Sequence, residues 1–151
     1  MPVDEHPRSP RAARHAAHKI QSLHRALRVV NEATGLDDPS ALAALEVVLS
    51  GIVRRLTPAE GRQLLAQLPL ELRESLRDVS PGPESGLTRG TIEAELARRL
   101  ALDPEVAAEL APKVGIAVRH LVSEGEMSDV LAQLPDDLKS MLPDEVLHQN
   151  P

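Results

Sequence analysis

The sequence contains no cysteine and no aromatic residue in its 151 positions. Without cysteine the chain has no disulfides, no thiolate metal ligands and no thiol nucleophile. Without Phe, Tyr and Trp it has no stacking platform for bases, no cation–π cage and no aromatic membrane belt. The core must therefore consist of Leu, Val, Ile, Ala and Met, and the composition is dominated by residues that favour helices over strands.

Long apolar runs are also missing. No segment approaches the ~20 apolar residues that a membrane-spanning helix needs. Residues 1–14 are polar and contain prolines, so they lack the apolar stretch of a signal peptide. We expect a cytoplasmic protein, which the lack of cysteine also favours. The excess of Arg over Lys, with abundant Ala, Leu and Pro, is typical of a GC-rich bacterial genome.

Charge is unevenly distributed along the chain. The net charge is −6, but basic residues outnumber acidic ones in residues 1–28. The basic residues there are Arg8, Arg11, Arg14, Lys19, Arg25 and Arg28, against Asp4 and Glu5. The simplest interpretation is a segment that is solvated or packs against the acidic body. The alternative is an arm that binds an acidic partner or nucleic acid.

The chain carries an internal repeat. The string LAQLP occurs at Leu65–Pro69 and again at Leu131–Pro135. Upstream of each copy, Thr57–Glu60 (TPAE) and Ser123–Glu126 (SEGE) have the pattern of a capping box, in which the first and fourth residues satisfy each other's backbone N–H groups. Matching features at an offset of about 65–66 residues indicate that one helical unit has been duplicated.

Apolar periodicity predicts helices at about 11–33, 39–56, 58–68 and 69–78, and again at about 88–100, 104–122, 124–134 and 135–142. We expect Gly35 to end the first helix. In Asp37-Asp38-Pro39 and Asp103-Pro104 we expect an Asp to cap the second helix of each copy, with Pro at the first helical position. Pro112 falls inside the predicted helix 104–122 and should kink or break it. The predicted fold is therefore an all-α helical bundle of two duplicated units, each of about four helices.

The predicted organisation follows from these elements. Residues 1–10 form a flexible tail, 11–79 the first helical repeat, 80–87 a linker rich in Pro, Gly and Ser, 88–142 the second repeat and 143–151 a second tail. We expect both repeats to share one compact domain.

The paired pattern of a long helix, a capped short helix, the AQLP string and a Leu-rich helix resembles the bacterial domain of unknown function 2267. The residues that carry this resemblance are Leu56, Glu60, Leu64–Pro69, Leu72 and Leu76 in the first copy, and Leu121, Glu126, Val130–Pro135 and Leu138 in the second. The resemblance covers about residues 20–142. It implies an all-helical fold and brings no established activity.

No combination of residues for catalysis stands out. The sequence has neither a nucleophile elbow nor a glycine-rich phosphate loop. His15 and His18 lie three residues apart on the first predicted helix, but no E-x-x-H or H-E-x-x-H motif accompanies them. We interpret them as part of a solvent-facing basic helix. We expect no enzymatic activity, no cofactor and no metal site, and a hydrolase with an unrecognised site is the least favoured alternative.

Polar pairs at helix ends have structural explanations. Asp136 and Asp137 lie at a predicted helix start, where the helix dipole favours negative charge. Gln67 and Gln133 occupy matching positions two residues before a proline. We expect both glutamines to satisfy backbone groups that the proline break leaves free.

The function predicted from these features is that of an interaction or regulatory module. The short helices 58–68 and 124–134 carry too little positive charge to read the major groove of DNA. A protein partner would engage the basic first helix or a groove between the two units, with Arg11, Arg14, Lys19, Arg25 and Arg28 as the partner-binding residues. The alternative is a nucleic-acid-associated protein that uses the same segment. The sequence is also compatible with a homodimer.

Overall fold

The computed structural model describes the backbone of residues 10–144 and the side chains of Arg14, Lys19 and residues 21–144. This part of the chain contains eight helices and no strand, which confirms the all-α prediction. The first half comprises α1 (Pro10–Thr34), α2 (Asp38–Arg55), α3 (Pro58–Gln67) and α4 (Leu70–Ser75). The second half comprises α5 (Arg89–Leu100), α6 (Pro104–Arg119), α7 (Glu124–Gln133) and α8 (Asp136–Lys139).

Most helix boundaries agree with the prediction to within about three residues. The last helix of each half is shorter than predicted, because α4 ends at Ser75 and α8 ends at Lys139. The predicted tails, 1–10 and 143–151, lie outside the described residues apart from Pro10, which begins α1, and residues 143 and 144.

Three local predictions can be compared with the structure. Gly35 has φ +80° and its N–H donates to Asn31 O at 2.8 Å, so it ends α1 as expected. An Asp caps α2 as expected, but the cap is Asp37, which accepts from the Ser40 N–H at 3.0 Å, so the helix begins at Asp38, one residue before Pro39. The matching prediction for Asp103 is wrong, because its side chain makes no capping bond with α6.

Pro112 does not break its helix. α6 continues through it from Pro104 to Arg119 as one helix. A proline inside a helix costs one backbone hydrogen bond and a local clash. Buried residues lie on both sides of it, including Ala107 and Leu110 before the proline and Val114 and Val118 after it. Packing along this buried face sustains the helix across the lost bond.

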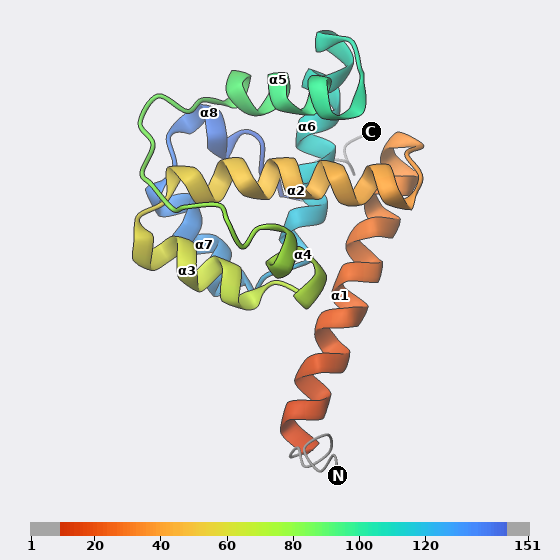
Figure 1. Ribbon diagram of the computed structural model, residues 1–151, viewed down its shortest axis with the longest axis vertical. Helices are drawn as coiled ribbons and strands as arrows, with labels where there is room; N and C mark the ends of the chain where they lie inside the picture. The colour runs from red at the N-terminus through yellow and green to blue at the C-terminus, as the bar shows by residue number, and fades with distance from the viewer. Residues whose placement is uncertain (1–9, 145–151) are drawn as a thin grey trace.

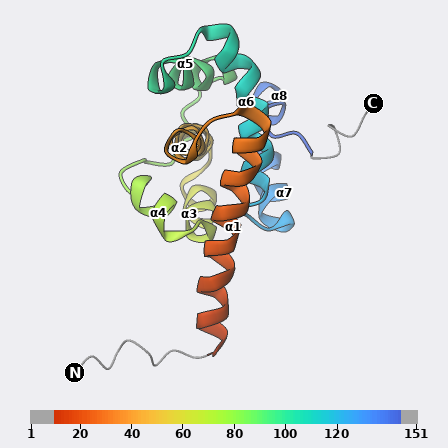
Figure 2. The same cartoon turned by 90° about the vertical axis from the view of Figure 1, so that its right-hand side faces the viewer.

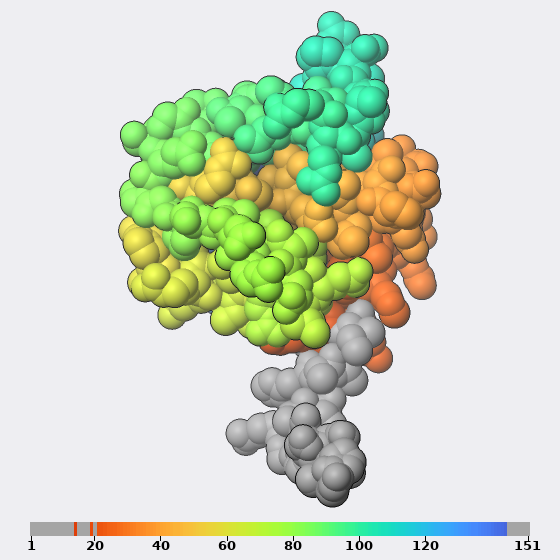
Figure 3. All heavy atoms as spheres, in the orientation of Figure 1, coloured from red at the N-terminus to blue at the C-terminus, as the bar shows by residue number. Residues whose placement is uncertain are grey.

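The core forms around α2, which lies in the middle of the body (Figures 1 and 2). Its buried side chains include Leu45, Leu49 and Ile52. α5 packs on α2 so closely that a Cβ at Gly51 would overlap the side chain of Ile92. In the space-filling view, α5 and the segment that precedes it cover much of α2 (Figure 3).

The two halves are interleaved. α1, from the first half, packs mainly on α6 of the second half, and α5 packs on both α2 and α6. Buried residues of all these helices belong to one continuous apolar cluster. Each half therefore completes its core with helices of the other half.

The predicted linker between the halves is held against the body. The Glu84 N–H donates to Arg54 O at 2.8 Å, and Leu87 is buried. The Arg54 guanidinium contacts Glu84 at 3.3 Å and both carboxylate oxygens of Glu95 on α5 at 3.2 and 3.3 Å. Arg54 thus connects the end of α2 to the linker and to α5.

α1 has two distinct parts. Its C-terminal part buries Leu23, Ala26 and Val30 in the core, whereas its N-terminal part extends beyond the other helices (Figures 1 and 2). No helix in the described part of the chain combines the length and the apolar character needed to cross a membrane.

Candidate functional site

The exposed face of α1 carries a row of arginines. Arg14, Arg25 and Arg28 are exposed. They are spaced by eleven and three residues, which at about 100° per residue places them within about 60° of one another around the helix axis. At a rise of about 1.5 Å per residue the row is about 21 Å long. We call Arg14, Arg25 and Arg28 the arginine row.

The other predicted partner-binding residues differ. Lys19 is half-buried, and its Nζ donates to Ala66 O at 3.1 Å, so it holds α1 against the end of α3. The side chain of Arg11 lies outside the described residues, as do those of His15 and His18.

A groove lies between α1 and the junction of the two halves. Its volume is about 440 Å³. The lining residues come from α1, from the end of α3 and from the segment between α6 and α7: Lys19, Ser22, Ala66, Gln67, His120, Leu121, Val122 and Ser123. Both halves thus contribute to this groove, and it adjoins the base of the projecting part of α1.

The glutamines of the two LAQLP strings connect the halves to each other. Gln67, the last residue of α3, accepts from the Ser123 N–H at 3.0 Å, and Gln133, the last residue of α7, accepts from the Thr57 N–H at 3.0 Å. Ser123 and Thr57 are the N-cap residues of α7 and α3. α3 and α7 therefore lie side by side and antiparallel, and the last residue of each helix accepts a hydrogen bond from the N-cap N–H of the other.

This exchange corrects two predictions. The glutamines satisfy backbone groups, as expected, but at the helix start of the other half and not at the proline break that follows them. The capping boxes are only half formed. The side chains of Thr57 and Ser123 accept from the N–H groups of Glu60 and Glu126. The N–H groups of Thr57 and Ser123, however, donate to the glutamines and not to the glutamate side chains.

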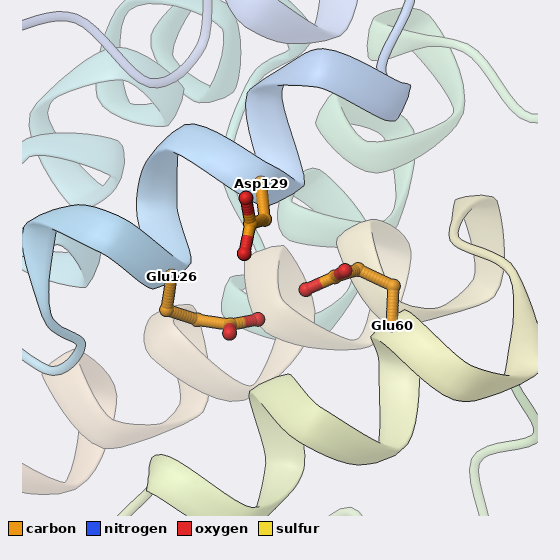
Figure 4. A group of neighbouring side chains, drawn as sticks. All are labelled: Glu60, Glu126 and Asp129. Atoms are coloured by element: carbon orange, nitrogen blue, oxygen red, sulfur yellow. The ribbon is translucent and has the colours of Figure 1, made fainter.

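The displaced glutamates point toward each other. Asp129, one turn further along α7, lies beside Glu60 of α3 and Glu126 of α7 (Figure 4). One carboxylate oxygen from each of the three residues lies within 4.8 Å of the other two. Glu126 is 6% exposed. One oxygen of Glu60 and one of Glu126 are buried without any hydrogen-bond partner. We call Glu60, Glu126 and Asp129 the carboxylate cluster.

Burial and negative charge act together on Glu126. Removal from water is the main cause that raises its pKa from 4.5 to about 8. The nearby carboxylates of Glu60 and Asp129 act in the same direction, because their negative charges disfavour ionisation of Glu126. At neutral pH Glu126 therefore tends to keep its proton, because its pKa of about 8 lies above that pH.

The carboxylate cluster was not predicted from the sequence. Glu60 and Glu126 were assigned to capping boxes, a local role that their position three residues after Thr57 and Ser123 suggests. The repeated glutamines are the signal that could have revealed the cluster. Each glutamine accepts from the N-cap N–H that a capping-box glutamate would otherwise bind, which leaves Glu60 and Glu126 free to turn toward each other.

These observations define the class of protein: a small all-helical protein whose two halves share one core and close each other's short helices. The chain belongs to the family described as uncharacterized conserved protein (DUF2267), whose model matches residues 23–141. This match confirms the resemblance seen in the sequence. It includes the carboxylate cluster, Gln67 and Gln133, and it begins after Arg14 and Lys19. No curated protein matches the chain.

Proposed function

We propose that this protein is a non-enzymatic interaction module that binds an acidic segment of a partner protein. The partner lies along the arginine row of α1 and enters the adjoining groove. As part of the same proposal, the module works in the bacterial cytoplasm, and its two halves descend from one duplicated helical unit.

The observation that carries the proposal is the arginine row itself. Arg14, Arg25 and Arg28 are exposed and form no ion pair with any residue in the described part of the chain. Guanidinium groups bind carboxylates through paired, directional hydrogen bonds, so a row of three suits an acidic peptide. The only acidic residue of α1 is Glu32, near its C-terminal end.

The rest of the molecule favours a protein partner over nucleic acid. The chain as a whole is acidic, with a net charge of −6, and lacks aromatic residues that stack on bases. A phosphate backbone would meet repulsion from most of the surface outside α1. A short acidic peptide confined to α1 and the groove avoids that repulsion.

The test compares two sets of charge reversals. The first, Arg14→Glu, Arg25→Glu and Arg28→Glu, inverts the row. The second, a matched control, inverts three exposed arginines of α3, α4 and the turn after it: Arg62, Arg73 and Arg77. Substitution is preferable to removal of α1, because Leu23 and Ala26 belong to the core.

Proteins captured from lysate after nuclease treatment are identified, purified and titrated against each variant. We expect a binary complex with one partner protein. The first set of substitutions should raise its Kd by at least roughly tenfold, which corresponds to about 1.4 kcal/mol, and the control set should leave the Kd unchanged. Equal loss in both variants would contradict a role for the row. Capture that vanishes with nuclease and falls steeply with salt would instead assign the row to nucleic acid.

A further inference from the structure

We propose that the carboxylate cluster of Glu60, Glu126 and Asp129 is a binding site for one hard divalent cation, of the class of Mg²⁺, Ca²⁺ and Mn²⁺. The ion would join α3 to α7 at the contact between the two halves. This site goes beyond the partner-binding function and does not depend on it.

The geometry suits a single ion. One carboxylate oxygen from each of the three residues lies within 4.8 Å of the other two. Oxygens bound to one cation at about 2.0–2.6 Å are separated by at most about 4–5 Å, when they lie on opposite sides of it. Small adjustments of the three side chains would therefore place all three oxygens around one ion.

The donor set selects the class of cation. All three ligands are carboxylates, which favour Mg²⁺, Ca²⁺ and Mn²⁺ over ions that prefer nitrogen or sulfur. Asp129 is exposed, so the side of the cluster that it forms is open to solvent. Water molecules on that side would complete the coordination that such ions require.

The burial of Glu126 is a second, independent observation that points to a ligand in the cluster. Glu126 is 6% exposed, it points toward Glu60 and Asp129, and its Oε2 has no donor (Figure 4). A buried carboxylate oxygen without a partner costs substantial free energy. A cation between the three groups would satisfy this oxygen and the unpartnered Oε2 of Glu60 together.

No protein cation takes this position. Among the described residues, none of the three carboxylates forms an ion pair with Lys, Arg or His. The third carboxylate comes from the second half alone. The α3 position that corresponds to Asp129, 66 residues earlier, is the neutral Gln63.

The experiment measures cation binding to the full chain after treatment with a chelator and dialysis. Mg²⁺, Ca²⁺ and Mn²⁺ are titrated separately by calorimetry. The melting temperature is followed by far-UV circular dichroism, with sodium chloride at matched ionic strength as the reference. Glu60→Gln and Glu126→Gln remove one ligand each. Glu124→Gln, an exposed glutamate of the same helix α7, is the control.

We expect one ion per chain for at least one of the three metals. At a hundredfold excess over Kd, binding to the folded state should raise Tm by roughly 5–10 °C. Each ligand substitution should weaken binding by at least roughly tenfold, and Glu124→Gln should not. The site would be disproved if no metal bound saturably up to roughly 10 mM, beyond the weak end of protein Ca²⁺ affinities, or if both ligand variants bound as tightly as the unaltered chain.

Discussion

Replacement of Glu126 by Gln should stabilise the protein in a buffer that contains a chelator, and the gain should grow with pH. Glutamine has the shape of the protonated glutamate and carries no charge. In the folded chain the pKa of Glu126 is about 8, against an ordinary value of 4.5. The folded state therefore binds a proton more tightly than the unfolded state does, and its stability falls as pH rises from about 4.5 to about 8.

The magnitude follows from the size of that shift. One pKa unit corresponds to about 1.4 kcal/mol, so the whole shift is worth about 4–5 kcal/mol above pH 8 and little below pH 4.5. The advantage of Glu126→Gln over the unaltered chain should thus increase by about 3–4 kcal/mol between pH 5 and pH 8.5. This is a large part of the 5–15 kcal/mol by which a typical domain is stable.

Urea unfolding at a series of pH values measures this directly. Urea is uncharged and leaves the charge interactions unscreened. Far-UV circular dichroism must supply the signal, because the chain has no Trp or Tyr for fluorescence. Glu124→Gln, exposed on the same helix, should follow the unaltered chain to within about 0.5 kcal/mol. If the midpoints of Glu126→Gln and the unaltered chain changed in parallel with pH, Glu126 would not have a raised pKa in the folded chain.

Four further substitutions test other contacts by urea unfolding. Gln67→Ala and Gln133→Ala should each cost about 1 kcal/mol, because each leaves an N-cap N–H of the other half without its acceptor; no loss in either would refute the exchange. Gly115→Ala should cost at least about 2 kcal/mol, since the new Cβ would overlap a backbone carbonyl of the segment after α8, and an unchanged midpoint would contradict that approach. Arg54→Ala should cost about 1–2 kcal/mol, and the loss should shrink in a Glu95→Gln background, whereas additive losses would show that the pair is not coupled.

Local features of the fold were predictable because they depend on neighbours in sequence. Thr57 and Ser123 mark helix starts through residues three positions away, and Gly35 marks a helix end through its own backbone freedom. Pro112 was misjudged because its local penalty is offset by packing with helices that are distant in sequence.

The candidate site was predictable only in part for the same reason. The charge of Arg14, Arg25 and Arg28 is visible in the sequence, and helical spacing places them on one face. The carboxylate cluster depends on Glu60 and Glu126 meeting across two helices that are 66 residues apart. Periodicity within one helix carries no information about such a contact.

The packing of α1 on α6 has a consequence for how the protein is made. α1 is synthesised before α6, its main packing partner, and α6 is completed only at Arg119, roughly 85 residues after the end of α1. At translation rates of about 5–20 residues per second, α1 waits about 4–17 s for its packing partner. During that interval the nascent chain exposes the apolar side of α1, including Leu23 and Val30, which the folded molecule buries, and this side of the helix is open to chaperones.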